Sequence, residues 1–285
     1  MSLNGYIIEK YNCMSNAYTC NRLVEEAQKE GIDLRIIGLY DTMVVGENLQ
    51  NNKEVLMQRD FIINRYKWGK IKDKVNALAR RSYNSLDAYN IYINKYEQVK
   101  RLTSSEFLVP DYCLATAAAS YDDISKALSV PFVAKGLESS MGEEIYLING
   151  EADFVELGKK FSFDKEWLFE EFIDTSYGRD MRFYSIRGNA VACMQRKSQG
   201  DFRANVALGA SVEPYEITPQ ISKIAKDVYD QTGLDFLGID LLFGKDKPYF
   251  CEINVMPGLE GIEKASGKNI AGMIISTIKG DFANE

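Results

Sequence analysis

The feature that most restricts the fold of this chain is a change in the order of its predicted strands and helices. Over about the first ninety residues, apolar strand-like runs at 5–9, 34–39 and 60–64 surround a segment of helical spacing at 16–29, which Gly31 ends. Strand–helix–strand order favours a small parallel sheet covered by helices. No glycine-rich dinucleotide fingerprint follows the first run, so this part is expected to be a scaffold that contributes one wall of a site.

A polar, tyrosine-rich and largely helical segment, 84–102, leads into a second unit, and its tyrosines are expected to pack in the core and between the units. Beyond residue 110, short strands follow one another as hairpins with a few helices among them, which is typical of an α+β body. The predicted strands are 130–134, 144–148, 167–173, 181–186, 190–195, 238–243 and 249–253. The predicted helices are 121–127, 152–161 and 219–232.

Charge and composition exclude several classes of function. The chain has 285 residues, about two domains' worth, and its 34 Lys and Arg against 41 Asp and Glu give a net charge of −7. No dense basic block is present, so nucleic acid is not the expected partner. The sequence contains 0 histidines. Histidine-based triads, histidine zinc sites and imidazole bases are therefore excluded, and any chemistry must come from other side chains or a recruited metal.

Cysteine usage and hydropathy indicate the compartment. The 5 cysteines are an odd number without a CxxC pair, which predicts buried thiols in a reducing environment. No run approaches the ~18 apolar residues of a membrane span, and the N-terminus lacks the basic-then-apolar order of a signal peptide. We therefore expect a cytoplasmic protein with no membrane partner.

The segment 237–261, LGIDLLFGKDKPYFCEINVMPGLEG, carries the strongest chemical signal. Its two apolar strands form a hairpin in which Asp240 can face Glu252 and Asn254, and the period of two puts the latter pair on one face. A carboxylate inside an apolar strand is costly to bury unless it has a partner. Three oxygen donors on one face suit Mg²⁺, and the alternative is a solvent-facing strand edge.

Two lysines are candidates for binding phosphate. Lys135 ends the β-branched run PFVAK and precedes the loop Gly136–Gly142, whose small residues could close over phosphates with their N–H groups. A lysine at a strand end is equally compatible with simple solvation, so both interpretations stay open. Lys95, in INKYEQVKRL, carries a weaker signal by itself.

Charged residues also gather around the strand that begins at GRDMRF. Alternation puts Asp180 and Arg182 on one face, either as part of a site or as a cross-strand ion-pair ladder. The polar loop that follows, with Arg196, Arg203 and Asn205 among its residues, predicts an anionic ligand in so acidic a protein. A merely solvated loop is the alternative.

Taken together and in this order, these segments resemble the ATP-grasp superfamily, and within it the RimK-type carboxylate–amine ligases such as the ribosomal-protein glutamate ligases. The resemblance covers most of residues 95–275. The matching stretches are Lys95, VAKGLESSMG, LFEEF, GRDMRF, RKSQGDFRANVALGA, LGIDLLF and CEINVMPGLEGIEKASGKNIAGMI. GDFRAN and EIN-x-x-PGLEGIE are the specific ones, and residues before 93 match only in general layout.

The resemblance implies a fold and a division into domains. It implies an α/β pre-ATP-grasp domain over 1–92, followed by an α+β ATP-grasp domain over 93–285. The latter would comprise a lid-bearing central subdomain, 93–169, and a C-terminal subdomain, 170–285, with the metal site and with ATP held between the two.

The resemblance also implies roles for individual residues. Lys95 and Lys135 would hold the α- and β-phosphates of ATP, the backbone at Glu171 and Phe172 would receive the adenine, and Asp180 would complete the nucleotide contacts. Arg203, Ala204 and Asn205 fall on the family's RSN segment, with Ala204 in place of serine and with Arg203 as the expected stabiliser of the transferring phosphoryl group. Asp240, Glu252 and Asn254 fall on the ligands of two Mg²⁺ ions, for which Mn²⁺ is a substitute. Arg182 and Arg196 are candidates for orienting the acid substrate.

The chemistry implied by the resemblance is formation of an acyl phosphate from ATP and a carboxylate, followed by attack of an amine such as glutamate. The carboxylate would belong to a small acid, a peptide C-terminus or a carrier protein, and relatives often form dimers or tetramers. Other ATP-grasp chemistry, such as carboxylation or phosphoryl transfer, and a non-catalytic ATP-binding module are the alternatives. Ser139 and Glu144 stand where related chains have glycine in the phosphate loop, which would restrict the lid or place Glu144 outside the site.

Overall fold

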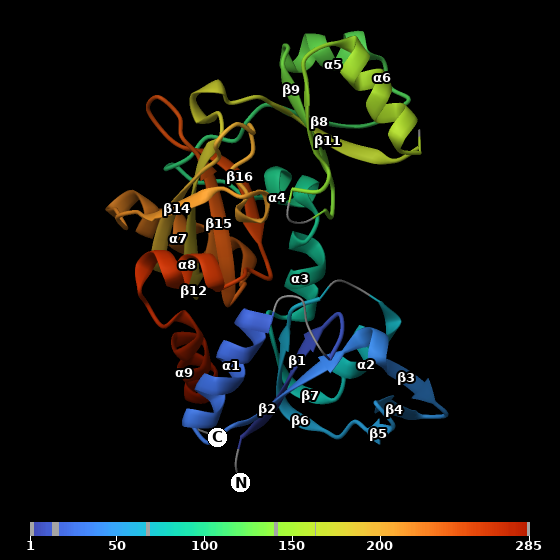
Figure 1. The fold of residues 1–285 in the computed structure, drawn as a ribbon, viewed down its shortest axis with the longest axis vertical. Helices are drawn as coiled ribbons and strands as arrows, with labels where there is room; N and C mark the ends of the chain where they lie inside the picture. Colours follow the sequence, from blue (N-terminus) through green and yellow to red (C-terminus); the bar gives the residue numbers. More distant parts are fainter. Residues whose placement is uncertain (1–2, 13–16, 67–68, 140–141, 163, 284–285) are drawn as a thin grey trace.

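The computed structural model describes residues 3–12, 17–66, 69–139, 142–162 and 164–283. Within these residues the strands form four sheets, arranged as three bodies along the long axis of the molecule (Figure 1). The N-terminal body lies at one end, a small sheet with two helices at the other, and the largest antiparallel sheet between them (Figure 1).

The N-terminal body is built on a parallel sheet, as the strand–helix–strand order predicted. Its strands lie in the order β2 (Asp33–Gly38), β1 (Asn4–Glu9), β6 (Arg59–Asn64) and β7 (Ala79–Tyr83). Helix α1 (Ala17–Lys29) connects the first pair, and α2 (Lys70–Asn76) precedes β7. β1 is buried almost throughout because it lies in the middle of the sheet and carries the apolar run GYIIE.

A second, three-stranded sheet in this body was not predicted. It consists of β3 (Thr42–Val45), β4 (Asn48–Asn51) and β5 (Glu54–Val55), all antiparallel. The strands are short and β4 is polar, so neither an apolar run nor a clear alternation marks them. Their turns depend on backbone that favours glycine or asparagine, with φ of 60° at Gly46 and 49° at Asn52.

Helices α3 (Leu86–Tyr92) and α4 (Lys95–Arg101) form the predicted crossing into the second unit. Ser85 and Asn94 cap them, since each side chain accepts hydrogen bonds from N–H groups of the first turn. Tyr89 and Tyr92 are buried in a cluster that includes residues of the large antiparallel sheet, which confirms the packing role expected for the tyrosine-rich segment.

The small sheet beyond the crossing is antiparallel, in the order β10 (Ile145–Ile148), β9 (Phe132–Gly136), β11 (Glu166–Glu171) and β8 (Tyr112–Thr116). Helices α5 (Tyr121–Leu128) and α6 (Glu151–Lys160) cover one face of it (Figure 1). Phe132, Phe154, Trp167 and Phe169 lie in one hydrophobic cluster between the helices and the sheet. Only β8 was missing from the predicted elements of this part.

The largest sheet has the order β14 (Ser211–Pro214), β13 (Asn189–Lys197), β12 (Arg179–Ile186), β15 (Phe236–Leu242) and β16 (Tyr249–Asn254). All its pairs are antiparallel, which confirms the predicted hairpins. Helix α7 (Pro219–Thr232) was predicted, whereas β14, α8 (Glu260–Ser266) and α9 (Ile270–Phe282) were not assigned from the sequence. Three 3-10 turns complete the described elements: Leu39–Asp41, Asp174–Ser176 and Val206–Leu208.

Helix α9 returns to the N-terminal body and packs beside α1 (Figure 1). One hydrophobic cluster therefore runs from Ile7 and Leu23 through Tyr184 and Phe236 to Ile274. The N-terminal sheet and the large antiparallel sheet share this core, and the domain boundaries suggested by the sequence stay a prediction. Among the described residues, no helix has the length and apolar character needed to cross a membrane.

Candidate functional site

A cavity of about 580 Å³ lies where the small sheet faces the largest one. Strands β9 and β11 form one side, and β12, β15 and the loop after β13 form the other. Of the residues predicted to contact a nucleotide, the cavity is lined by Lys135, Glu171, Phe172, Asp180, Arg203, Ala204 and Asn205. The fold thus brings together residues that are up to seventy positions apart in the sequence.

Lys135 lies at the end of β9 inside the cavity, with its side chain almost fully buried. Its ammonium group forms an ion pair with Glu170 and lies 3.4 Å from the carbonyl oxygen of Cys251. Burial works to lower the pKa of Lys135, but Cys251 and Glu170 outweigh it and raise that pKa. Lys135 is therefore a fixed positive charge that faces the cavity, as a phosphate ligand has to be.

The end of β11 supplies polar backbone to the cavity. The N–H of Glu171 donates to the carbonyl of Asp111 at 2.8 Å, so it is already used within the protein. The aromatic ring of Phe172 lies against Tyr177 and Phe202, with ring centroids 6.2 Å and 6.3 Å away. A flat ligand at this place would meet Glu171 and the apolar side chains of Phe172 and Phe202.

Arg203 enters the cavity from the loop after β13. Its guanidinium group binds both carboxylate oxygens of Asp201, at 3.0 Å and 2.7 Å, and donates to the carbonyl of Gly142 at 2.8 Å. Asn205 packs against the same glycine, because a Cβ at position 142 would lie 3.1 Å from its Oδ1 atom. Arg203 and Asn205 therefore connect the loop between β9 and β10 to the opposite wall of the cavity.

Beneath the cavity, two arginines and two aspartates form a buried ion network across β13, β12 and β15. Arg196 binds Asp180 through two hydrogen bonds of 2.6 Å and Asp240 through one of 2.7 Å. Arg182 binds Asp240 through two more of 2.6 Å. Asp180 and Arg182 share a face, as predicted, and both form cross-strand ion pairs. Asp180 also lines the cavity, so the ion-pair ladder and a site are not exclusive here, and the ligand contacts of both residues stay predictions.

Because this network is buried, the attraction between its aspartates and arginines is strong enough to shift the pKa of Asp240. Burial works to raise the pKa of Asp240, but the charges of Arg182 and Arg196 outweigh it and lower the pKa to about 2. Asp240 is therefore ionised at neutral pH. Arg196 has 2% of its surface exposed, and its role as a substrate ligand stays a prediction that would require these ion pairs to open. Arg182 is more exposed than Arg196 and borders the open side of the network.

The hairpin of β15 and β16 places the predicted metal ligands side by side. Asp240 is the cross-strand neighbour of Glu252, and Asn254 is two residues further along the same strand, opposite Gly238. Lys95 lies 3.5 Å from the Glu252 carboxylate and donates to the carbonyl of Ser139 at 2.5 Å. Lys95 does not line the cavity. It lies between the loop after β9, which contains Ser139, and the hairpin of β15 and β16.

These oxygen donors fit a hard divalent cation. Two carboxylates and an amide oxygen are ligands that Mg²⁺ accepts. A carboxylate offers about four acceptor positions, and Asp240 uses three of them on arginines. Among the described residues, Glu252 forms one ion pair, with Lys95, and lies near the charge of Lys135. The donor set is therefore compatible with the predicted metal site.

Ser139 and Glu144, the two residues that stand in place of glycine in the predicted phosphate loop, both contact other parts of the protein. The carboxylate of Glu144 lies 2.5 Å from Lys165 and packs against Gly136, away from the cavity lining. The hydroxyl of Ser139 donates to the carbonyl of Gly136 at 3.1 Å. Two further residues of the predicted loop, Ser140 and Met141, lie outside the described residues.

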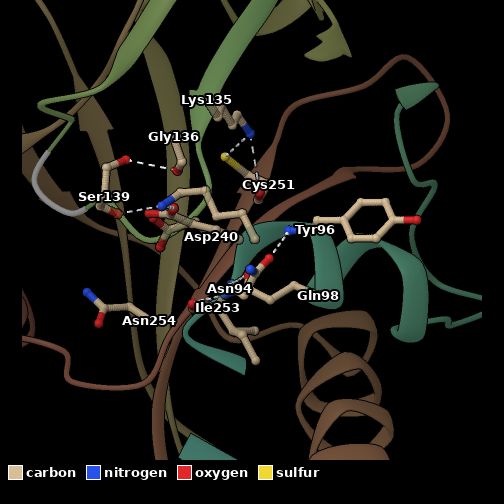
Figure 2. Close-up of polar contacts among 12 residues, drawn as sticks. Asn94, Tyr96, Gln98, Lys135, Gly136, Ser139, Asp240, Cys251, Ile253 and Asn254 are labelled. Atoms are coloured by element: carbon tan, nitrogen blue, oxygen red, sulfur yellow. Dashed lines mark hydrogen bonds and ion pairs between the residues drawn. The ribbon is translucent and has the colours of Figure 1, made fainter. Parts of the chain in front are cut away.

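Several cavity residues were not identified from the sequence, including Glu170, Arg179, Leu242 and Cys251. The position of Cys251 could not be predicted because a β-bulge changes the pairing of β15 with β16. Asp240 pairs with Glu252, but the next residue, Leu241, pairs with Phe250. The bulge leaves Cys251 without a partner on β15 and turns its side chain toward Lys135 (Figure 2). Glu170 had a usable signal, because an acid in the apolar run WLFEEFI needs a buried cation as a partner.

Comparisons with known proteins agree on one family. Residues 93–278 match the profile of the RimK-like ATP-grasp domain. A probable alpha-L-glutamate ligase of Thioalkalivibrio sulfidiphilus is 37% identical over 168 residues, which are 57% of this chain and 56% of that protein. A probable alpha-L-glutamate ligase of Aliivibrio fischeri is 28% identical over 283 residues, 92% and 91% of the two chains. The first match thus spans little more than half of that relative.

A solved structure supports the same fold. The ATP-grasp ligase PsnB, complexed with minimal precursor, Mg and ADP, superposes with a TM-score of 0.70 at 14% identity. The superposition covers 98% of this chain and 98% of that one.

Proposed function

The chain belongs to the RimK-like ATP-grasp family, and on that premise we propose that it is an ATP-dependent ligase that joins a carboxylate to an amine. We propose glutamate as the amine substrate, because the curated relatives carry the name alpha-L-glutamate ligase. The carboxylate substrate is that of a small acid, a peptide C-terminus or a carrier protein.

One observation carries the proposal. A cavity with two fixed cations, Lys135 and Arg203, lies directly beside a hairpin whose oxygen donors suit a divalent cation. This combination of cationic side chains, an apolar slot and hard oxygen ligands fits a nucleoside triphosphate with its metal. A site for a neutral substrate would need neither the cations nor the carboxylates.

The side chains then divide the work of binding. Phe172 and the backbone at Glu171 receive the adenine, and Asp180 contributes from the opposite wall of the cavity. Lys135 and Lys95 hold the α- and β-phosphates from two sides. Asp240, Glu252 and Asn254 would hold Mg²⁺, which offsets negative charge as the acid approaches the triphosphate.

The reaction proceeds in two steps. A carboxylate oxygen of the substrate attacks the γ-phosphorus, the bond to the β,γ-bridging oxygen breaks, and ADP leaves behind an acyl phosphate. Arg203 stabilises the charge on the phosphoryl group during this transfer, because its guanidinium group is fixed in the cavity wall. The amine nitrogen then attacks the acyl carbon, inorganic phosphate leaves, and the nitrogen loses a proton to give the amide.

An ADP-release screen with Mg²⁺ tests the proposal. ADP should form only when a carboxylate and an amine, with glutamate among the amines, are present together, and mass measurement should show the joined product. Glu252→Gln should lower ADP release at least ~100-fold, because it removes a charged ligand from the metal site. The matched control is Glu260→Gln, at an exposed residue whose one ion pair among the described residues is with Lys264, and it should leave the rate unchanged.

Each other outcome contradicts a stated part of the proposal. ADP release with a single acceptor, without an amine, would indicate phosphoryl transfer. Affinity for ATP without turnover would indicate a binding module. A Glu252→Gln protein as active as the wild type would remove the metal assignment.

A further inference from the structure

Strand β16 carries two of the proposed metal ligands, yet it is the outermost strand of its sheet. Its backbone faces β15 on one side only. An outermost strand with unpaired N–H and C=O groups is free to twist or move, so its side chains are poorly fixed unless another element covers it. The first half of β16 is covered by the segment at Leu108, which pairs with Tyr249 and Phe250.

The second half of β16 is covered by one buried side chain, Gln98 of helix α4. Its Oε1 atom accepts a hydrogen bond of 2.8 Å from the N–H of Ile253, and its Nε2 atom donates one of 2.9 Å to the carbonyl of the same residue (Figure 2). The second Nε2 proton goes to the carbonyl of Tyr92 at 2.7 Å. Gln98 is 2% exposed, so no water competes for these bonds.

The two hydrogen bonds between Gln98 and Ile253 fix the backbone on both sides of Ile253. The N–H of Ile253 belongs to the peptide unit that joins it to Glu252, and its carbonyl belongs to the unit that joins it to Asn254. Gln98 therefore fixes both peptide planes between the two ligand residues, and with them the directions of their Cα–Cβ bonds. A second buried amide, Asn84, donates to the carbonyl of Val255 at 3.1 Å and fixes the chain just beyond.

The same helix also carries Lys95, which lies 3.5 Å from Glu252 and reaches the phosphate-loop wall at Ser139. Asn94 caps the helix by accepting from the N–H groups of Tyr96 and Glu97. Helix α4 thus sets the phosphate lysine and the metal-bearing strand in one rigid arrangement.

We propose that Gln98 is a positioning residue of the metal site, which holds Glu252 and Asn254 in the geometry that a divalent cation requires. The inference rests on the proposed function, because it needs the hairpin to bind the metal. Residues that orient metal ligands are worth about 10–100-fold in metal affinity in other proteins. A residue that merely fills space in the core would affect stability and would weaken all ligands alike.

The test compares ADP affinity with and without the metal, by calorimetry in Mg²⁺ and in EDTA. In the wild type, Mg²⁺ should tighten ADP binding. Gln98→Met, which keeps the length of the side chain but removes the amide, should reduce that Mg²⁺-dependent gain about 10-fold or more. ADP affinity in EDTA should change less than 2-fold, since Lys135 and the adenine contacts are unaffected.

Gln231→Met is the matched control. Gln231 also holds both backbone groups of one residue, since it accepts from the N–H of Thr103 at 3.0 Å and donates to its carbonyl at 2.8 Å. It does so between the loop at Thr103 and helix α7, without contact to β16. Its replacement should leave the Mg²⁺-dependent gain intact.

Gln98→Glu keeps the inference testable if the methionine variant does not fold. A protonated glutamic acid can still donate to the carbonyl of Ile253, whereas the ionised form repels it. Because burial raises the pKa of a glutamic acid, the Mg²⁺-dependent gain of this variant, relative to wild type, should increase as the pH falls and the side chain takes up a proton.

Three results would overturn the inference. The first is a Gln98→Met protein with the same Mg²⁺-dependent gain in ADP affinity as the wild type, and the second is a Gln98→Met protein whose ADP affinity falls as much in EDTA as in Mg²⁺. The third is a Gln98→Glu protein whose reduced Mg²⁺-dependent gain does not change with pH. A wild type that binds ADP more tightly with Mg²⁺ but forms no amide would overturn the ligase proposal and leave this inference standing. A wild type whose ADP affinity is the same in Mg²⁺ and EDTA would overturn the metal site and the inference together.

Discussion

The four charged residues below the cavity show how single side chains are held in this protein. Asp180, Arg182, Arg196 and Asp240 are two acids and two bases, so the network is neutral overall although nearly all of it is buried. An unpaired charge at such a place would cost several kcal/mol, and each aspartate here has at least one arginine held through two hydrogen bonds. The pairing keeps Asp240 ionised and in place for its proposed role in metal binding.

Lys72 is the opposite case, a buried cation that forms no ion pair within the part of the chain that the structure describes and has only the charge of Asp73 near it. Its ammonium group has no hydrogen-bond partner among the described residues and lies 3.3 Å from the centre of the Tyr89 ring. Burial lowers the pKa of Lys72 to about 7. The cation–π contact with Tyr89 offsets only part of the cost of desolvating the charge.

Lys72→Met should therefore stabilise the protein, by roughly 2–3 kcal/mol at pH 6. Between pH 7 and 10.5 the unfolded wild type holds a proton that the folded form has released, so wild-type stability rises with pH over this window. The advantage of the variant should shrink over the same window and vanish above it.

Urea unfolding at pH 6 and pH 10 measures this effect. Lys74→Met on the same helix is the control, because Lys74 is exposed and its loss should change stability by less than ~0.5 kcal/mol at either pH. A Lys72→Met variant less stable than wild type at pH 6 would show that the buried ammonium group is stabilising.

At the scale of elements, the geometry of β16 decides how the site is arranged. A bulge on its β15 side turns Cys251 into the cavity, and Gln98 on its outer side fixes the peptides beside Ile253. The strand itself is apparent from the apolar run YFCEI, but a bulge depends on the register with its neighbour. Alternation along one strand puts successive residues on opposite faces. It therefore could not predict that Cys251 lines the cavity while its neighbour Glu252 faces Asp240.

The small sheet with α5 and α6 owes its stability to an aromatic cluster of its own. Phe154 of α6 is buried there next to Phe169, with ring centroids 5.8 Å apart. Phe154→Ala should lower the free energy of unfolding by about 3–5 kcal/mol, because it leaves a cavity in this cluster.

The neighbouring Val155 provides the control, since it is on the same helix and 45% exposed. Val155→Ala should change the free energy of unfolding by less than ~0.5 kcal/mol. Circular dichroism during urea denaturation reports both. Equal effects of the two replacements would mean that α6 does not depend on the aromatic cluster.

At the scale of the whole molecule, the cavity lies between bodies that have separate cores. Lys135 and Phe172 belong to the small sheet and its end, whereas Asp180 and Leu242 belong to the large one. The small sheet's aromatic cluster does not merge with the cluster under the large sheet. A ligand in the cavity would thus connect two units and favour their folded arrangement.

Saturating Mg²⁺ and ADP should therefore raise the melting temperature. Ligand at about 100 times its Kd adds about 2.7 kcal/mol to the free energy of unfolding, which corresponds to roughly 4–5 °C in a chain of this size. The shift should be small with Mg²⁺ alone and reduced in Glu252→Gln. A shift of full size in that variant would argue that the hairpin does not bind the metal.

Local sequence patterns were sufficient to predict most helices and strands and the residues of the hairpin that we propose binds the metal. Apolar periodicity and turn residues act over a few positions, so the hairpin that brings Asp240 next to Glu252 and the helices at α5, α6 and α7 could be predicted. Short polar strands such as β4, and elements outside clear apolar runs such as β8 and β14, could not.

Which side chains contact one another depends on the three-dimensional fold. Arg196 and Asp240 are 44 residues apart in sequence, and Gln98 and Ile253 are 155 apart. Such contacts depend on the order of strands in the sheets and on the path of α4 across the edge of β16. Because this order arises from burial of the whole core, no local pattern contains it. The sequence could therefore name the proposed ligand residues but not the contacts that hold them in place.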